Sequence, residues 1–390
     1  MSNSLDADLS VRLAALDTAG LRRGLRRVDS PQGREIMLDG RRVLNFSSND
    51  YLGMATDPSL IEAAARAARD FGSGSGASRL ISGSLAPHHE LEAALAAWKG
   101  TAAALTFGSG FATAIGVIPA VVDRSDIVIL DRRVHACCVD GARLSGATLR
   151  ICRHNDLDDL ERLLRWARSR PGAPRILIVT ESIFSMDGDR TPLAELVALK
   201  DRFGAWLMLD EAHATGLFGA RRTGLAEAAG VADQVELLWG TLGKSLGASG
   251  GYLCGSRTLV DYLVSRARSI LFSTAPVPAA AAAAGEAVRR IQGLEGERRC
   301  ATVWQRIGDL AGHALGLSGS SAIIPVPIGD EHCAVAVARN LLDQGIFVPA
   351  IRYPTVARGQ ARLRISVTAN HQSGDITRLA EAVRSIAPPR

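Results

Sequence analysis

Hydrophobic residues in the middle of the chain fall into short runs that alternate with longer amphipathic stretches. The stretches Leu157–Ala167 and Leu193–Arg202 repeat their apolar residues with helical spacing. Seven apolar runs around them have the length of β-strands: Ala102–Phe107, Asp126–Leu130, Thr148–Cys152, Arg175–Thr180, Ala205–Leu209, Val235–Trp239 and Gly251–Cys254. This alternation predicts an α/β fold with a mostly parallel, seven-stranded central sheet covered by helices. Such sheets bind ligands at the carboxyl ends of their strands.

The pattern changes on both sides of this region. Residues 1–45 predict a helical arm and a short hairpin over Glu35–Leu44 that turns at Asp39 and Gly40. After residue 285, a helical stretch is followed by strand-like runs and one further helix, at Ala322–Ile328, His332–Gln344, Ile346–Ile351 and Arg362–Thr368. We therefore expect an N-terminal arm and hairpin over 1–45, a large domain over 46–285 and a smaller C-terminal α+β domain over 286–390.

The composition is that of a folded globular protein with a large core. Of 390 residues, 47% are hydrophobic and 22% are charged, which excludes intrinsic disorder. The formal net charge is +5, but the basic residues are spread along the chain, whereas a nucleic-acid-binding protein gathers them into one stripe. We therefore expect no nucleic-acid partner.

The expected compartment is the cytoplasm. The six cysteines form no C-x-x-C pair and no zinc-ligand spacing, as in a protein with reduced thiols. The first ten residues, MSNSLDADLS, lack the basic and apolar regions of a secretory signal. No stretch approaches the ~20 apolar residues of a membrane span, so we expect no membrane partner.

Lysine is rare, because only three of the 45 Lys and Arg residues are lysines. Lys99 and Lys200 stand beside polar residues on helical stretches, where we expect an exposed position and tolerance of arginine. Lys244 follows the strand Val235–Trp239 in a glycine-rich loop. Arginine cannot form a Schiff base, because this reaction needs a primary amine that can lose its proton. We therefore predict a reactive Lys244; the alternative is an ordinary loop lysine.

Two further features would complete a site for pyridoxal 5'-phosphate around such an amine. Asp210 follows the run Ala205–Leu209, and a carboxylate that leaves a buried strand needs a partner. It either caps a helix or pairs with the pyridine nitrogen of the cofactor, which makes that ring an electron sink. The turn Gly108–Phe111 opens a helix after a strand, as phosphate-binding turns do, although one such turn is weak evidence.

The chain also contains two strings that occur in P-loop helicases. Asp210–His213 spells DEAH, and Gly243–Ser245 spells the end of a P-loop. A P-loop requires glycine where Leu238 stands, and in helicases it precedes the acidic box. An ATPase or helicase is therefore a poor fit.

The residues around Lys244 and Asp210 belong to a set of strings by which the sequence resembles the α-oxoamine synthases. The strings are Asn45–Gly53 (NFSSNDYLG), Ser185–Asp189 (SMDGD), Asp210–Gly216 (DEAHATG) and Gly240–Lys244 (GTLGK). The resemblance covers about residues 10–385. This family consists of fold-type-I pyridoxal-phosphate enzymes. The resemblance implies that architecture, acyltransferase activity and a homodimer with its active site at the subunit interface.

The resemblance also implies roles around the cofactor. Lys244 would bind pyridoxal 5'-phosphate as a Schiff base and move the α-proton of the substrate. Asp210 would pair with the pyridine nitrogen, His213 would bond the phenolic oxygen, and His135 would stack over the ring. The other cofactor contacts that it implies are Gly110, Phe111, Ser185 and Thr241.

Substrate contacts are implied for Arg26, Asn49, His135, Arg352, Thr355 and Arg364. Arg364 matches the arginine that holds the amino-acid carboxylate, and a bidentate guanidinium suits that task. Without the resemblance, Arg362 and Arg364 on one strand would predict a solvated face. Tyr353 stands where the family pattern has proline, so the shape of the acyl-chain entrance stays open.

The branch of the family that fits best condenses L-alanine with a pimeloyl thioester, releases CO2 and serves biotin biosynthesis. The string DEAHATG favours alanine, whereas Arg266–Pro278 also fits relatives that use glycine. A sister enzyme that uses glycine or serine with another acyl-CoA is the alternative. The choice between pimeloyl-ACP and pimeloyl-CoA stays open, and the basic segment Arg22–Arg27 suits either. A scaffold without activity is disfavoured, because every expected catalytic position is filled.

Overall fold

The computed structural model describes residues 4–312, 317 and 319–386. The chain divides into two compact units, one of residues 49–303 and one that joins the segment up to residue 48 with the segment from residue 304 onward. This division differs from the expected borders after residues 45 and 285. A strand of the N-terminal hairpin pairs with a strand near residue 346, and the helix that spans residue 285 packs within the larger unit.

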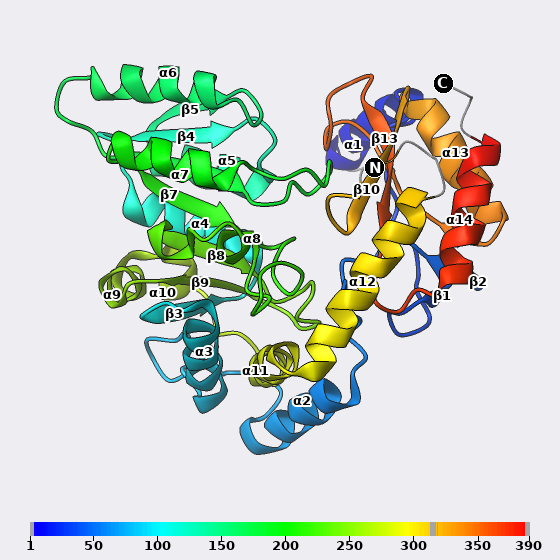
Figure 1. Ribbon diagram of the computed structural model, residues 1–390, viewed down its shortest axis with the longest axis horizontal. Coiled ribbons are helices and arrows are strands. Elements are labelled where there is room, and N and C mark those ends of the chain that lie inside the picture. Colours follow the sequence, from blue (N-terminus) through cyan, green and yellow to red (C-terminus); the bar gives the residue numbers. More distant parts are fainter. Residues whose placement is uncertain (1–3, 313–316, 318, 387–390) are drawn as a thin grey trace. The chain divides into compact units, whose positions relative to one another are not determined.

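The larger unit contains the expected seven-stranded sheet, and each predicted run forms one of its strands. The strands are β3 (Ala103–Phe107), β4 (Ile127–Asp131), β5 (Thr148–Cys152), β6 (Ile176–Glu181), β7 (Trp206–Asp210), β8 (Leu237–Thr241) and β9 (Gly251–Gly255). Their order across the sheet is β3-β9-β8-β7-β6-β4-β5 (Figure 1). β9 is antiparallel to both of its neighbours, and the other adjacent pairs are parallel. The prediction of a mostly parallel sheet is confirmed.

Helices cover both faces of this sheet because its strands are apolar on both sides. The helical elements that lie wholly within the larger unit are α2 (Pro58–Phe71), α3 (Ala86–Lys99), α4 (Gly110–Val121), α5 (Ala136–Ser145), α6 (Leu157–Arg168), α7 (Leu193–Arg202), α8 (Leu225–Ala228), a 3-10 turn (Ala232–Gln234), α9 (Arg257–Arg266), α10 (Arg268–Leu271) and α11 (Pro278–Gln292). On one face, Val117 of α4 and Cys138 of α5 join a buried cluster with Val128 and Leu177 of the strands. On the other face, α6 packs against β5 and α7 against β7 (Figure 1).

Polar caps set where several of these helices begin. The side chains of Ser109 and Asp156 accept hydrogen bonds from backbone N–H groups in the first turns of α4 and α6. Asp57 caps α2 in the same way, and Pro58 follows in its first turn. Because Ser109 stands just after β3, the N-terminus of α4 lies at the carboxyl end of that strand.

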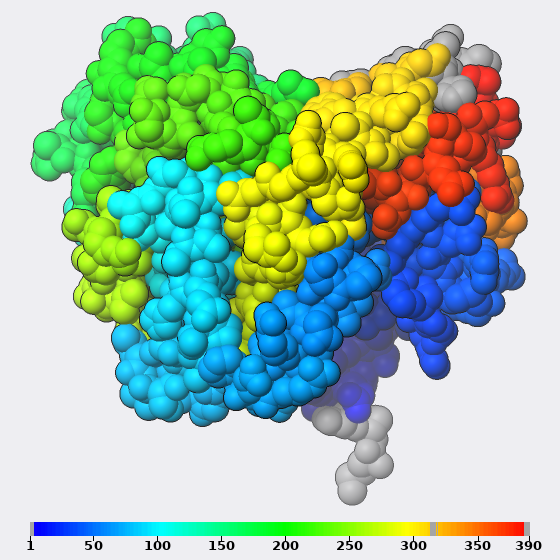
Figure 2. Space-filling model, turned by 60° about the horizontal axis from the view of Figure 1, so that its bottom comes forward, coloured from blue at the N-terminus to red at the C-terminus, as the bar shows by residue number. Residues whose placement is uncertain are grey.

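A group of three helices closes one end of the larger unit. Alanines along α11, among them Ala281, Ala284 and Ala287, are buried where this helix contacts α2 and α3. Small side chains let the helices approach closely. Figure 2 shows the blue segment of α2 beside the yellow segment of the chain around residue 290. There Asp57 Oδ2 lies 2.6 Å from Nη2 of Arg299, in the first part of α12 (Leu294–Gly312).

The smaller unit contains two three-stranded sheets, β1-β2-β11 and β10-β13-β12. Its elements are α1 (Ser4–Thr18), β1 (Glu35–Leu38), β2 (Arg41–Asn45), β10 (Ile323–Gly329), α13 (Glu331–Asp343), β11 (Ile346–Phe347), β12 (Ala350–Ile351), β13 (Ala361–Ser366) and α14 (Ser373–Ile386). The predicted hairpin is present, and its turn residues Asp39 and Gly40 have φ values of 48° and 78°. Glycine adopts such angles without strain, which explains the sharp turn.

The predicted run Ile346–Ile351 is wrong as a single strand. Its first two residues form β11, which pairs with β2, and its last two form β12, which pairs with β13. Pro349 stands between them and has no N–H to donate to a strand ladder, so the chain leaves one sheet and joins the other there.

The described part of the chain contains no helix that is both long enough and apolar enough to cross a bilayer.

Candidate active site

The carboxyl ends of three adjacent strands bring the expected residues to one edge of the large sheet. Asp210 is the last residue of β7, Glu181 the last of β6 and Thr241 the last of β8. Glu181 and Asp210 are direct neighbours across the β6–β7 pair. Lys244 follows Thr241 in the loop to β9. Parallel sheets of this kind bind ligands at this edge.

A chain of four polar side chains runs along this edge. Nζ of Lys244 lies 2.8 Å from Nε2 of His213, and the Tyr51 hydroxyl lies 2.6 Å from Nδ1 of the same ring. Tyr51 also donates to Oδ1 of Asn49 at 3.2 Å. One proton arrangement satisfies all these contacts: Lys244 donates to Nε2, and Nδ1–H donates to Tyr51. This row of hydrogen-bonded side chains therefore holds His213 as the tautomer with its proton on Nδ1.

Two buried carboxyl groups lie beside these residues. Asp210 is 5% exposed and Glu181 is 1% exposed. Burial raises the pKa of Asp210 to about 6, against the lowering effect of Lys244. Burial and the charge of Asp210 raise the pKa of Glu181 to about 8. At neutral pH the pair therefore holds one proton, and repulsion from the charge of Asp210 favours its place on Glu181.

The hydrogen bonds of these carboxyl groups come mainly from the backbone. Oδ1 of Asp210 accepts the N–H of Ala212 at 2.8 Å, and Oε2 of Glu181 accepts the N–H of Ser185 at 2.9 Å. Ser185, an expected cofactor contact, is thus tied to the end of β6. Within the described residues, Oε1 of Glu181 is buried without a hydrogen-bond partner. Such atoms are rare in folded proteins and are expected where a ligand or a water completes the site.

A second imidazole links the loops that carry His135 and Ser185. Nδ1 of His154 lies 3.0 Å from Asp131, and its Nε2 lies 2.6 Å from Asp189. Asp131 ends β4 four residues before His135, and Asp189 stands four residues after Ser185. Burial lowers the pKa of His154, but the bonds to Asp131 and Asp189 outweigh this effect and raise the pKa to about 9. His154 is therefore a cation at neutral pH and holds the two loops together.

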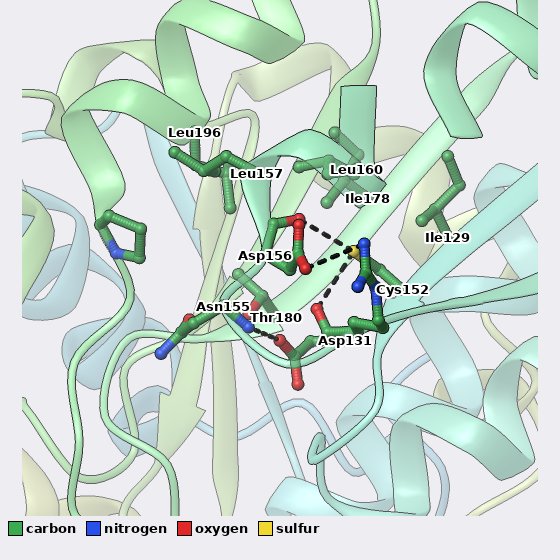
Figure 3. A pocket seen from close by; sticks show the side chains of 12 residues that line it. Ile129, Asp131, Cys152, Asn155, Asp156, Leu157, Leu160, Ile178, Thr180 and Leu196 are labelled. Atoms are coloured by element: carbon green, nitrogen blue, oxygen red, sulfur yellow. Dashed lines mark hydrogen bonds and ion pairs between the residues drawn. The ribbon is translucent and has the colours of Figure 1, made fainter. Parts of the chain in front are cut away.

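Figure 3 shows the interior of the larger unit next to Asp131 and Asn155. The backbone N–H of Asn155 donates to Oδ2 of Asp131 at 2.8 Å, which adds a further tie to the end of β4. Beyond it, apolar side chains of the strands and of α6 and α7, among them Ile129, Ile178 and Leu160, surround a cavity of about 20 Å³. A space of this size holds about one water molecule, so the substrate cannot bind there.

The turn expected to bind phosphate opens α4. Gly110 is the first residue of the helix, and a Cβ at this position would meet the Cβ of Thr241 at 3.4 Å. Glycine therefore leaves space between the N-terminus of α4 and the end of β8, where Thr241 stands. Phe111, the next residue, is 45% exposed in this chain. The structure thus brings Gly110 and Thr241 together and leaves Phe111 at the surface of the unit.

The expected substrate residues of the smaller unit form a group of their own. Arg26, Arg352 and Thr355 line one cavity of about 350 Å³. Nε of Arg26 lies 2.7 Å from Oδ2 of Asp39, and its guanidinium lies 5.7 Å from the centre of the Phe347 ring. The cavity therefore has a cationic rim and an apolar wall.

Arg364 is buried on β13, with 5% of its surface exposed. Its Nη1 donates to Oγ of Ser366 at 2.9 Å. The solvated face that the strand pattern alone would predict is therefore wrong for Arg364. Tyr353, the departure from the family pattern, is partly exposed, and the guanidinium of Arg358 lies 4.5 Å from the centre of its ring.

The expectation of exposed positions for Lys99 and Lys200 is wrong. Both residues are 2% exposed. Nζ of Lys99 donates to Oγ1 of Thr215 at 2.9 Å and to the carbonyl of Thr223, whereas Nζ of Lys200 lies 2.7 Å from each of two carboxylates. Asp201 is the next residue after Lys200, but Thr215, Thr223 and Glu236 come from distant segments, so the sequence around the two lysines did not indicate that they are buried.

Sequence reasoning did not assign a role to Tyr51 or Glu181. Tyr51 lies inside the string NFSSNDYLG, two residues after Asn49, so its neighbourhood was recognisable. Glu181 directly follows the predicted strand Arg175–Thr180, as Asp210 follows its own strand. The same strand-end reasoning that selected Asp210 would have selected Glu181.

Comparison with known proteins identifies the family. The family model of aminotransferase class I and II matches residues 41–383. An 8-amino-7-oxononanoate synthase from Anaeromyxobacter dehalogenans (strain 2CP-1 / ATCC BAA-258) is 47% identical over 386 residues, which cover 97% of this chain and 95% of the relative. The chain belongs to the 8-amino-7-oxononanoate synthase family. The expected resemblance to the α-oxoamine synthases is thereby confirmed.

Solved structures agree with this family in fold. A serine palmitoyltransferase from S. paucimobilis with bound PLP has a TM-score of 0.91 at 28% identity, over 98% of this chain and 99% of that one. An 8-amino-7-oxononanoate synthase from Francisella tularensis shares the fold, with a TM-score of 0.75 at 24% identity, over 88% of this chain and 97% of that one. The fold-type-I prediction is therefore confirmed.

Proposed function

We propose that this member of the 8-amino-7-oxononanoate synthase family condenses L-alanine with a pimeloyl thioester and releases CO2 and the thiol carrier. The cofactor would be pyridoxal 5'-phosphate bound to Lys244. One observation carries the proposal: the Lys244 amine lies 2.8 Å from His213 at the same sheet edge where Asp210 is buried. An amine, an imidazole and a buried carboxylate at adjacent strand ends are the groups that this cofactor requires.

The residues at this edge fit the cofactor. Asp210 is a buried carboxyl group with a raised pKa, and a protonated pyridine nitrogen would stabilise its charge. The N-terminus of α4 beside Gly110 suits a phosphate, because backbone N–H groups point outward there. Space exists between Gly110 and Thr241 because residue 110 has no side chain. Lys244 supplies the primary amine.

The chemistry then divides between the cofactor and the protein. When bound, pyridoxal phosphate would delocalise the electron pair left on the α-carbon of alanine. After the amino group of alanine has replaced Nζ of Lys244 on the cofactor, the free Nζ would take the α-proton and return it after CO2 has left. His213 would stay in one tautomer, because Tyr51 fixes its Nδ1. Glu181 would keep its own proton, so that only Asp210 adds negative charge beside the ring.

Substrate binding would use basic and polar side chains. Arg364 would hold the carboxylate of alanine and so select which bond of the α-carbon reacts. Arg26, Arg352 and Thr355 would receive the thioester, since the cavity that they line has an apolar wall and a cationic rim. Asn49 and His135 are further proposed contacts of the substrate. Such a rim suits the phosphates of coenzyme A and of an acyl carrier protein equally.

Serine is the alternative amino-acid substrate, because two structures of serine palmitoyltransferases resemble this chain closely. One has a TM-score of 0.91 at 28% identity, and the other has a TM-score of 0.90 at 31% identity. The relative from Anaeromyxobacter dehalogenans is 47% identical. The higher identity supports alanine. We further propose that two copies of the chain form a homodimer that completes the active site.

The test is a visible spectrum of the purified protein, followed by turnover with alanine, glycine or serine and a pimeloyl thioester. We expect absorbance of a lysine-bound cofactor, and product with alanine. Lys244→Arg should remove both the absorbance and turnover. Lys200→Arg makes the same chemical change where the amine only bridges two carboxylates, so it should retain both. A spectrum without cofactor absorbance would reject the cofactor, and product with serine alone would reject the substrate.

A further inference from the structure

A large cavity lies at the amino-terminal edge of the central sheet, at the other end of the strands that lead to the candidate active site. Its volume is about 690 Å³, and every residue that lines it belongs to the larger unit. Trp206 and Leu237, the first residues of β7 and β8, line it, whereas Asp210 and Thr241 end the same strands. Each strand has five residues, so its two ends are about 13 Å apart. The cavity is therefore separate from the catalytic edge.

The walls of this cavity are mainly apolar. Val121, Leu237 and Leu259 contribute aliphatic side chains, and Trp206 and Tyr262 contribute aromatic ones. Tyr262 is 45% exposed, and Trp206 is only partly covered by the core of the unit. Cavities that hold small organic ligands have volumes of about 300–1,000 Å³ and walls of this kind. The volume and the walls therefore suit a small organic molecule with an apolar body.

Three polar groups on these walls make no hydrogen bond or ion pair within the described part of the chain. They are the indole N–H of Trp206, the hydroxyl of Tyr262 and the carboxylate of Asp233. A few polar groups that orient a ligand within an apolar cavity are typical of binding sites. These three groups are open to such a ligand, because no other side chain occupies them.

The charges around the cavity favour a cation over an anion. Among the described residues that line it, Arg175 is the only basic one, and its guanidinium already pairs with two carboxylates, of which Asp126 lies at 2.5 Å. Glu236 pairs with Lys200 at 2.7 Å, whereas Asp233 has no ion pair. An anionic ligand would face carboxylates that are already in place, whereas a cationic ligand would find Asp233 unpaired.

We propose that this cavity is a binding site for a small organic cation with an aromatic or aliphatic body. Asp233 would pair with the positive group, and the rings of Trp206 and Tyr262 add to this preference, because aromatic faces attract cations. The body of the ligand would cover the aliphatic wall at Val121 and Leu259. No residue that lines the cavity belongs to the candidate active site, so this site is independent of the proposed function.

The first test compares two probes with the same body and opposite charge, by isothermal titration calorimetry on the full chain. The cation is trimethyl(3-phenylpropyl)ammonium, which has no N–H and so cannot form a Schiff base with a cofactor, and the anion is 4-phenylbutyrate. We expect the cation to bind at one site per chain, at least about tenfold more tightly than the anion. Equal affinities, tighter binding of the anion, or no binding of the cation at about 10 mM would overturn the proposal.

The second test places the bound cation with variants at exposed positions, which leave the core intact. Asp233→Asn should raise the dissociation constant of the cation about 2- to 5-fold, as loss of one exposed ion pair does. Tyr262→Ala should raise it about 3-fold or more, because it removes an aromatic face and apolar contact. Asp158→Asn changes an exposed carboxylate on α6 that does not line the cavity, so it should bind as the wild type does. An unchanged dissociation constant in both Asp233→Asn and Tyr262→Ala would overturn the site.

Discussion

Glu181 and Asp210 end neighbouring strands, and at the scale of single residues burial raises the pKa of both, while the charges around them determine which of the two is ionised. Lys244 lowers the pKa of Asp210, whereas Asp210 itself raises that of Glu181, so one carboxylate and one carboxylic acid face each other. A pair whose pKa values are pushed apart in this way is typical of functional sites. Because the pKa of Glu181 in the folded protein is raised above its ordinary value, the stability of the protein depends on pH.

Replacement of Glu181 by Gln tests this pair. The folded protein holds the proton of Glu181 up to about pH 8, whereas the unfolded chain loses it near 4.5, so the wild-type protein becomes less stable as pH rises between these values. Glu181→Gln should lack this loss, and its free energy of unfolding should exceed that of the wild type by about 1 kcal/mol or more at pH 8. Urea denaturation at pH 5, 6.5 and 8 measures the difference. Glu195→Gln, on the exposed side of α7, should follow the wild type.

At the scale of elements, the loops after β4 and β6 depend on each other through His154. Neither loop has regular structure where it bears His135 and Ser185, yet both are expected at the cofactor. The cation between Asp131 and Asp189 fixes their spacing. Loops held by a rigid scaffold are the usual place for functional residues.

Replacement of His154 should lower the free energy of unfolding by an amount that depends on pH. The pKa of His154 is raised from 6.5 to about 9, so its contribution to stability is fully present below pH 6.5 and disappears as pH rises through 9. We expect His154→Asn to be clearly destabilised at pH 6 and to approach the wild type above pH 9, as measured by urea denaturation. His89→Asn, at an exposed histidine, should show no such convergence. If the free energies of unfolding of the wild type and His154→Asn differ by the same amount at every pH, His154 is not the cation that we infer.

Lys99 connects the end of α3 with the loop that follows β7. Its ammonium is fully buried, and Nζ lies 5.2 Å and 5.3 Å from the ring centres of Trp98 and Tyr252. Burial lowers the pKa of Lys99, against the opposing charge of Glu211. The amine is thus enclosed by Thr215, the carbonyl of Thr223 and two aromatic rings.

Lys99→Arg should therefore destabilise the protein, contrary to the tolerance expected from the sequence. A guanidinium is larger than an ammonium, and overpacking of a buried site costs about 1–3 kcal/mol. The free energy of unfolding of Lys99→Arg should fall by this amount, while Lys200→Arg, whose partners are half-exposed carboxylates, should lose less. If Lys99→Arg and Lys200→Arg lose the same free energy of unfolding, the enclosure of Lys99 is not what destabilises Lys99→Arg.

At the scale of the whole molecule, the fold does not choose the substrate. A serine palmitoyltransferase matches this chain with a TM-score of 0.91, above the 0.75 of an 8-amino-7-oxononanoate synthase from Francisella tularensis. The two activities therefore share one architecture. We therefore expect substrate choice to come from side chains that the fold leaves free to vary, and the cavity of Arg26, Arg352 and Thr355 is the proposed place.

The proposed homodimer is testable at this scale. The chain has a mass of 41.2 kDa, so analytical ultracentrifugation should give about twice that value at micromolar concentration. Mixing Lys244→Arg with Arg364→Ala should restore part of the activity if Lys244 of one copy and Arg364 of the other serve the same active site. Sedimentation at the mass of one chain would reject the dimer, and a dimer without restored activity would show that these two residues of one site come from the same copy.

Several features could be predicted from the sequence because they depend on neighbours along the chain. The apolar runs identified all seven strands of the large sheet, the Asp39–Gly40 turn identified the hairpin, and the loop after Val235–Trp239 identified Lys244 as the candidate amine. Strand period, turn chemistry and the need for a primary amine are local or chemical properties. The motif strings NFSSNDYLG, DEAHATG and GTLGK indicate the family by themselves.

Other features depended on segments that are distant in the sequence. Only the tertiary structure showed that Lys99 is enclosed, that Glu181 lies against Asp210 with one unsatisfied oxygen, and that the run around Pro349 serves two sheets. Burial of a side chain depends on which other elements cover it, and a sequence pattern gives only the face on which it stands. The sequence by itself therefore determined which reactive groups this protein has. The tertiary structure decided the charge states of those groups, because burial and neighbouring charges set their pKa values.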